Sequence, residues 1–135
     1  MKQKQLKCPY CGAYAYCRPA SVVYGNVSRR KDSYLYICSR WPVCDSYVGA
    51  HQNSREPLGT LANSELRHKR ILAHRALSEL QRQRHMKKWE AYIWLQAKLG
   101  LSESQTHISM FSEYMCEQTI SMCRQALAPP HNRAA

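Results

Sequence analysis

The chain has 135 residues, of which 20 are Lys or Arg and 9 are Asp or Glu, so its formal net charge is +11. This length suits one ordinary domain, or a metal-held module of about forty residues followed by a helical part. No stretch approaches the roughly 20 apolar residues of a membrane span, and no apolar run follows the basic N-terminus. We therefore predict neither a membrane span nor a signal peptide, and we expect a cytoplasmic protein.

The positive charge is concentrated in the first two thirds of the chain. Residues 1–88 carry 17 basic and 5 acidic side chains, a net charge of +12, whereas residues 89–135 carry 3 basic and 4 acidic ones, a net charge of −1. Such a split favours a basic half that binds a polyanion and a neutral half that packs. The alternative is a surface that is basic only for solubility.

Four cysteines near the N-terminus have the spacing of a zinc site. Two residues separate the first pair, five separate the second pair, and twenty-six lie between the pairs. Each pair can wrap a turn around one ion, and Pro9, Gly12 and Pro42 suit such turns. We predict a four-cysteine zinc ribbon over residues 1–50 with one structural zinc ion, rather than metal-free or redox cysteines. The predicted ligands are Cys8, Cys11, Cys38 and Cys44.

Two other side chains are alternative ligands for this metal. Seven cysteines, an odd number, fit four thiolates and three free thiols better than they fit disulfides. Cys17 stands six residues after Cys11, which is the same step as from Cys38 to Cys44. His51 lies seven residues beyond Cys44 and is the second alternative.

The ribbon is unusually rich in aromatic residues. Alternation over residues 13–18 and the aromatic and branched residues over 33–38 predict two strands, and residues 21–24 predict a third. Seven of the nine tyrosines lie in this part of the chain. So thin a fold cannot bury them all, and we predict an exposed aromatic surface that stacks unpaired bases beside basic side chains. The predicted nucleic-acid contacts here are Arg29, Arg30, Lys31, Tyr36, Arg40 and Trp41.

Two family resemblances rest on these and later residues. Cys-Pro-Tyr-Cys-Gly at 8–12, followed by Cys-Ser-Arg-Trp-Pro-Val-Cys at 38–44, resembles the four-cysteine zinc ribbons at the C-terminal end of bacterial type IA topoisomerases. That resemblance implies binding of single-stranded DNA. Tyr-Val-Gly-Ala-His at 47–51, Tyr-Ile-Trp-Leu at 92–95 and His-Ile-Ser-Met-Phe at 107–111 resemble a small zinc-finger family of bacteriophages and prophages with no settled function.

After the ribbon, the pattern becomes helical. Turn formers over residues 51–62 predict a connecting loop, residues 63–128 a helical region and residues 129–135 a tail. A first helix begins at Asn63 or Ser64, a second ends at Gly100, and a third stops before Pro129. Residues 65–88 carry eight Lys or Arg against two acids, which favours a phosphate-binding surface. The predicted contacts on the first helix are Arg67, Lys69, Arg70 and Arg75.

These features together predict an α+β protein in which a small antiparallel ribbon packs with about three helices. The predicted function is a phage-type accessory protein that binds nucleic acid, single-stranded or locally opened DNA first, with little sequence preference. The alternative is a protein-interaction module that grips a host enzyme through the same aromatic and basic surface. A nuclease-like enzyme is the third interpretation, but His51, Asn53 and His74 lack the spacing of a ββα-metal nuclease. We therefore predict no catalytic residue.

Overall fold

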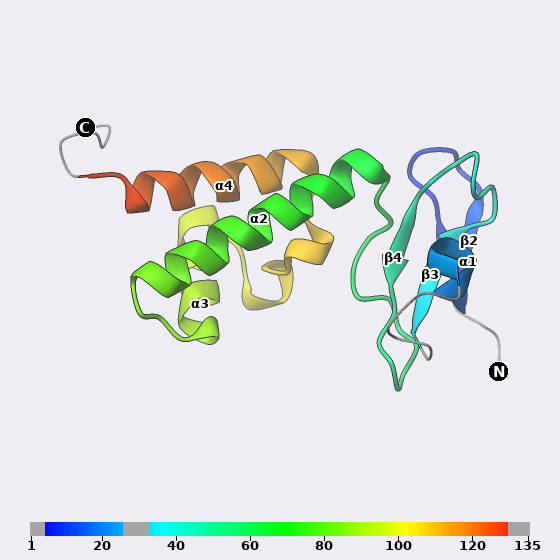
Figure 1. Cartoon of the computed structure of the whole chain (residues 1–135), viewed down its shortest axis with the longest axis horizontal. Coiled ribbons are helices and arrows are strands. Elements are labelled where there is room, and N and C mark those ends of the chain that lie inside the picture. The colour runs from blue at the N-terminus through cyan, green and yellow to red at the C-terminus, as the bar shows by residue number, and fades with distance from the viewer. Residues whose placement is uncertain (1–4, 26–32, 130–135) are drawn as a thin grey trace. The chain divides into compact units, whose positions relative to one another are not determined.

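The computed structural model describes residues 5–25 and 33–129 (Figure 1). It divides the chain into two compact units, Met1–Glu65, here called the ribbon unit, and Leu66–Ala135, here called the helical unit. Strands dominate the described part of the ribbon unit, and helices fill the described part of the helical unit. The predicted α+β class is confirmed. No helix in the described part of the chain is long and apolar enough to span a membrane.

The ribbon unit is built on an antiparallel sheet with the strand order β1-β2-β3-β4. β1 (Gln5–Lys7) pairs with β2 (Tyr14–Pro19), β2 pairs with β3 (Tyr34–Cys38), and β3 pairs with β4 (Tyr47–Gly49). Because side chains alternate between the faces of a strand, this register fixes which residues share a face.

The two faces of the sheet have different cores. On the first face, Ala15, Tyr36 and Val48 pack with Cys8 and Cys38. On the second face, Leu35 and Ile37 are buried beneath other hydrophobic side chains. The covering residues of the second face are Val22, Val23, Trp41 and Tyr47.

The strand predicted over residues 21–24 is wrong. Ser21–Tyr24 forms the short helix α1, in which the backbone N–H of Tyr24 donates to the carbonyl of Ala20 at 3.0 Å. Val22 and Val23 are adjacent rather than alternating, and both pack on the second face of the sheet. A single helical turn directs two neighbouring side chains to one surface, which a strand cannot do.

The segment predicted as a connecting loop packs back on the ribbon unit. Isolated bridges join Tyr47 with Ala62 and Ala50 with Pro57. Leu61 is buried in the same core as the cysteines. Residues 51–62 therefore complete the ribbon unit rather than merely leading away from it.

The described helical unit contains three long helices joined by short turns. α2 (Ser64–Gln83) begins at one of the two predicted residues, and α3 (Lys88–Leu99) ends at Gly100, as predicted. Gly100 has a φ of 68°, the left-handed conformation that favours glycine at a helix end. Two 3-10 turns, η2 (Glu103–Gln105) and η3 (Ile108–Met110), lead from α3 to the last helix.

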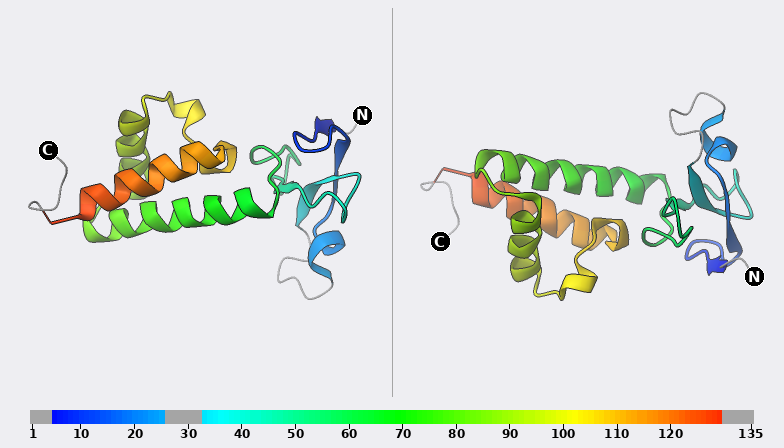
Figure 2. Two further views of the ribbon diagram at one scale, coloured as in Figure 1. Left: turned by 90° about the horizontal axis from the view of Figure 1, so that it is seen from above. Right: turned by 90° about the horizontal axis from the view of Figure 1, so that it is seen from below.

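α4 (Glu113–Leu127) lies beside α2 and runs in the same direction, as all views show (Figures 1 and 2). Lys69 forms an ion pair with Glu117 near the start of both helices. Near their ends, the guanidinium of Arg84 donates to the carbonyl of Ala126. α3 and the turns make the return crossing that a parallel helix pair requires.

Apolar side chains and two thiols fill the core of the helical unit. Burial raises the pKa of Cys116, and it raises the pKa of Cys123 to about 11. Both thiols therefore stay protonated at neutral pH and act as small apolar groups, in line with their helical spacing. The fully or almost fully buried residues include Leu80, Leu95, Ile108, Phe111, Cys116, Thr119 and Cys123.

Candidate metal centre and nucleic-acid interface

The four predicted ligands converge on one point of the ribbon unit. The sulfur atoms of Cys8, Cys11, Cys38 and Cys44, here called the cysteine cluster, all lie within 4.8 Å of one another. The sulfur atoms of Cys11 and Cys38 are 3.4 Å apart, and those of Cys8 and Cys44 are 3.6 Å apart. These distances exclude disulfides, whose sulfurs are about 2 Å apart. They approach the roughly 3.8 Å between sulfurs that a Zn–S distance of about 2.3 Å gives in a tetrahedron.

Two tight backbone turns place the sulfurs. In the first, the N–H of Gly12 donates to the carbonyl of Cys8 at 2.9 Å, and the φ of Gly12 is 79°. In the second, the N–H of Trp41 donates to the carbonyl of Cys38 at 2.9 Å, and that of Cys44 donates to Arg40 at 3.1 Å. Each turn directs its two thiols toward the same point, so the chain needs little rearrangement to bind an ion.

Ser46 is a partner of the cluster that the sequence analysis missed. It is fully buried, and its hydroxyl oxygen lies 3.1 Å from the Cys8 sulfur and 3.6 Å from the Cys44 sulfur. Burial acts to raise the pKa of Cys8, but hydrogen bonds from Ser46 and from the Tyr10 and Cys11 backbone outweigh it and lower this pKa to about 6. The cluster thus favours a thiolate at Cys8.

Cys38 shows why the cluster calls for a cation. Burial, together with the neighbouring thiols and against the backbone hydrogen bond from Arg40, raises the pKa of Cys38 to about 12. Four thiolates cannot share so small a volume unless a positive ion compensates them. A soft dication with a tetrahedral preference meets this need, and the site fits one structural zinc.

The two alternative ligands lie outside the cluster. Among the described residues, neither Cys17 nor His51 joins the group of sulfur atoms. Cys17 is on β2, opposite Tyr36, and packs against the core beside the cluster. His51 is exposed in the segment after β4.

Tyr36 is not a stacking residue, which corrects the prediction. It is 2% exposed, and its hydroxyl donates to the carbonyl of Arg55 at 2.6 Å. Its ring belongs to the core that surrounds the cysteine cluster. No ring face is left for a base, so the role of Tyr36 is structural.

Trp41 belongs to an aromatic surface on the second face of the sheet. Its ring meets that of Tyr47 edge to face at 5.8 Å, and Tyr24 meets Tyr47 in the same way at 6.0 Å. Tyr16 lies in the same register row as Ile37 and Tyr47, so it shares this face, as does Tyr14 two residues before it. We call Tyr14, Tyr16, Tyr24, Trp41 and Tyr47 the aromatic face.

The alternation over residues 13–18, which predicted a strand, also indicates which side chains share this face. In β2, the small residues Ala15 and Cys17 alternate with Tyr14, Tyr16 and Arg18. Small residues face the cysteine cluster, where space is limited, so the tyrosines point away from it.

Basic side chains accompany the aromatic face. Lys7 pairs with Tyr14, and Arg18 follows Tyr16 by two residues, so both lie on this face, and both are exposed. Arg40 is exposed beside Trp41. The predicted contacts Arg29, Arg30 and Lys31 lie outside the described residues.

Arg55 and Tyr34 form a second aromatic and basic pair, which the sequence analysis also missed. The guanidinium carbon of Arg55 lies 3.4 Å from the centroid of the Tyr34 ring. Its Nε donates to the Gln52 carbonyl at 3.3 Å, and its φ of 61° is left-handed. The pair could not be predicted from the sequence, because the segment after β4 must fold back before Arg55 reaches Tyr34.

The predicted phosphate contacts on α2 do not form one surface. Arg70 is only 7% exposed, and its Nε donates to the Phe111 carbonyl at 3.0 Å, so its prediction as a phosphate contact is wrong. Lys69 forms an ion pair with Glu117, and its Nζ lies 4.0 Å from Oε2 of Glu113. Arg67 is half-buried and Arg75 is exposed.

Comparison with known families agrees with the metal centre. A family model described as a zinc-finger-containing domain matches residues 4–126, which include the whole cysteine cluster. Comparison with curated proteins and with solved structures finds no match. The match extends over most of both units. The chain therefore belongs to the family of zinc-finger-containing domains and carries a four-cysteine site for one structural zinc ion.

Proposed function

We propose that the ribbon unit, folded around zinc, binds single-stranded nucleic acid through the aromatic face. The observation that carries this proposal is the gathering of four tyrosines and one tryptophan on the sheet face opposite the cysteine cluster. Tyr14 is 50% exposed and Tyr24 is 48% exposed. Unpaired bases stack on such rings whatever their sequence, which suits binding with little sequence preference.

The ring contacts support this role by holding the face in place before a ligand arrives. The Tyr24 hydroxyl donates to the Tyr47 hydroxyl at 3.2 Å, and the ring of Tyr47 is also in contact with Trp41. Rings that are already fixed lose little conformational entropy on binding. Lys7, Arg18 and Arg40 then supply the positive charge that a phosphate backbone requires.

The proposal favours DNA over RNA and assigns no catalytic step to the chain. The preference for DNA rests on the resemblance of residues 8–48 to the topoisomerase zinc ribbons. The resemblance to phage and prophage proteins supports an accessory role in the cytoplasm of a bacterial host, where a reducing environment keeps thiolates available to zinc.

Binding of labelled oligonucleotides tests the proposal. Fluorescence anisotropy with a single-stranded DNA and its duplex, at several salt concentrations, should show tighter binding to the single strand. Tyr14→Ala and Tyr16→Ala should each weaken that binding by about 1–3 kcal/mol without changing the salt dependence. Arg18→Ala should lower the slope of log K against log salt by about one unit. Tyr114→Ala is the matched control, because Tyr114 is exposed on α4 in the helical unit.

Two results would contradict the proposal. Equal losses on single and double strands would remove the stacking role of the aromatic face, because paired bases offer no free faces. Absence of binding to DNA and to RNA of the same sequence at low salt would remove nucleic acid as the ligand. Tighter binding to RNA would keep the face and change only its preferred ligand.

A further inference from the structure

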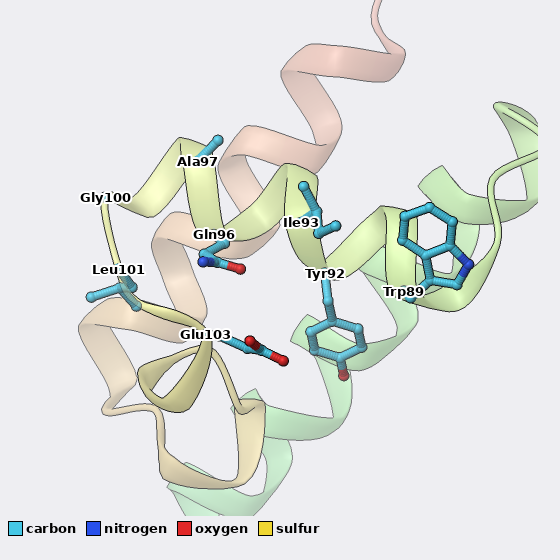
Figure 3. A pocket seen from close by; sticks show the side chains of 8 residues that line it. All are labelled: Trp89, Tyr92, Ile93, Gln96, Ala97, Gly100, Leu101 and Glu103. Carbon is cyan, nitrogen blue, oxygen red and sulfur yellow. The ribbon is translucent and has the colours of Figure 1, made fainter.

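The helical unit has an open pocket on the outer side of α3. Its volume is about 810 Å³ (Figure 3). One wall is a single face of α3, with residues at helical steps of three and four, and the other is the chain that follows Gly100. The lining residues that matter here are Trp89, Tyr92, Ile93, Gln96, Leu101 and Glu103.

The apolar residues of this pocket are not needed by the core of the helical unit. α3 buries Ala91 and Leu95 completely on another side of the helix. Trp89 is nevertheless 60% exposed and Ile93 is 55% exposed, four residues apart on the pocket face. A large aromatic and a branched aliphatic side chain held at the surface of one hollow are typical of an interaction site.

The charge of the pocket selects the ligand. Among the described residues that line the pocket, Glu103 alone carries a charge. Its carboxylate and the ring of Tyr92 point into the same hollow, with Trp89 at one end (Figure 3). Burial raises the pKa of Tyr92, so its hydroxyl stays neutral at neutral pH. A carboxylate beside aromatic rings repels phosphate and attracts a cation that has an apolar stem.

We propose that this pocket docks a peptide segment of a partner protein through an arginine side chain. The guanidinium meets the carboxylate of Glu103, and its plane and aliphatic stem lie along Tyr92 and Trp89. Arginine fits better than lysine, because a guanidinium both stacks on rings and forms paired hydrogen bonds with a carboxylate. An aliphatic neighbour of the arginine packs on Ile93 and Leu101.

The segment that lines the pocket is less basic than the rest of the chain. The pocket lies in the part of the sequence, residues 89–135, whose net charge is −1. All lining residues belong to the helical unit, so the inference stands independently of nucleic-acid binding by the ribbon unit.

The test uses the full-length, zinc-loaded chain labelled with ¹⁵N at tryptophan. Its three indole N–H signals come from Trp41, Trp89 and Trp94. The variants Trp41→Phe and Trp89→Phe assign the first two, and the remaining signal is that of Trp94. The probes are an acetylated, amidated Leu-Arg-Leu peptide and the same peptide with citrulline, which is neutral, in place of arginine. The arginine peptide should shift the Trp89 signal saturably and leave that of Trp41 in place. The citrulline peptide should bind about tenfold more weakly.

Two variants with matched controls sharpen the result. Glu103→Gln keeps the size of the side chain and should weaken binding of the arginine peptide about tenfold, whereas Glu65→Gln, an exposed acid outside the pocket, should not. Ile93→Ala should weaken both peptides, whereas Ile71→Ala on α2 should weaken neither. Circular dichroism at 222 nm equal to that of the unsubstituted chain shows that each variant is folded.

Four outcomes overturn the inference. Equal binding of the two peptides, or unchanged binding by Glu103→Gln, removes recognition of the charge. A Trp89 signal that shifts with protein concentration alone identifies a second copy as the occupant. An equal saturable shift with spermidine identifies a free polyamine site. A shift of Trp89 with single-stranded DNA, and none with the peptide, identifies nucleic acid as the ligand.

Discussion

The ribbon unit and the helical unit are stabilised in different ways. The ribbon unit has strands of three to six residues, and its core is built around four thiols. The helical unit has helices of 12 to 20 residues and buries Leu80, Leu95, Ile108 and Phe111. A sheet this small removes too little apolar area from water to offset the entropy of ordering its chain, so it depends on metal ligation. The helical unit obtains its stability from apolar burial.

The buried polar groups show the same difference. In the ribbon unit, the buried Ser46 directs its hydroxyl to two sulfurs of the cysteine cluster. In the helical unit, Arg70 and Thr119 donate to backbone carbonyls, those of Phe111 and Met115. Polar burial therefore tunes a ligand in one unit and supplies donors to backbone carbonyls in the other.

The largest expected effect is the loss of a zinc ligand. Cys38→Ser should release the zinc ion and unfold the ribbon unit, since zinc-finger peptides gain about 10–16 kcal/mol from the metal. The helical unit should keep its circular dichroism at 222 nm. Elemental analysis gives the zinc content per chain, and Cys17→Ser is the control that should retain one zinc. Loss of helical signal in the Cys38 variant would break the division into two independently stabilised units.

A cavity in the core of the helical unit should destabilise that unit and leave the zinc site intact. Leu95→Ala removes a fully buried side chain and should lower the free energy of unfolding of this unit by about 2–5 kcal/mol. Thermal and urea unfolding followed at 222 nm measure the loss, and zinc content should stay at one per chain. Ile93→Ala, two residues away but exposed, should cost less than about 0.5 kcal/mol. Similar costs for the two variants would show that α3 does not bury Leu95 in solution.

Removing the hydroxyl of Ser46 should weaken the metal site without destroying it. Ser46→Ala deletes the hydrogen bond that favours the thiolate of Cys8, and outer-shell changes of this kind lower metal affinity about 10–100-fold. Competition with a chelator at fixed pH measures the zinc affinity. Thr119→Val removes an equally buried hydroxyl from α4 and should leave that affinity unchanged. An unchanged zinc affinity in the Ser46 variant would show that only the four sulfurs contribute to metal binding.

The smallest expected effect concerns the ion pair between α2 and α4. Lys69→Gln removes the pairing with Glu117, and because both side chains are partly exposed, the cost should be below about 1 kcal/mol. The difference from the unsubstituted chain, measured by urea unfolding, should shrink as salt is added. A cost above 2 kcal/mol that persists in high salt would instead assign Lys69 a packing role.

The metal centre could be predicted from the sequence because ligand spacing is a local property of two turns. The aromatic surface was predicted with Trp41 as a member, but Tyr36 was wrongly included and Tyr14 and Tyr16 were not named. β3 is covered on both faces, by the cysteine core and by the residues around α1, so its sequence shows no apolar and polar alternation. The exposure of Tyr36 could not be read from such a strand. β2 is half exposed, and its alternation does identify Tyr14 and Tyr16.

Arg70 shows a signal that was present but outweighed by its charge. Leu66, Arg70, Ala73 and Leu77 recur at steps of three and four and share the buried side of α2. Position alone therefore placed Arg70 on the apolar stripe. The carbonyl of Phe111 that accepts its hydrogen bond is 41 residues away, which no local pattern can reveal. For the same reason, the α3 pocket could not be predicted, since its second wall depends on how the chain turns after Gly100.

The second cysteine turn carries a further consequence. Trp41 lies within it, between two zinc ligands, yet its ring is part of the aromatic face on the other side of the sheet. The segment that supplies two of the metal ligands is thus also the segment that positions one ring of the aromatic face. Under the proposed function, metal occupancy would set the binding competence of the chain, although no ligand sulfur would touch a base. Chelation or thiol oxidation would silence the ribbon unit, and restoring reductant and zinc would reactivate it, which gives an experimenter a reversible control that leaves every proposed contact residue intact.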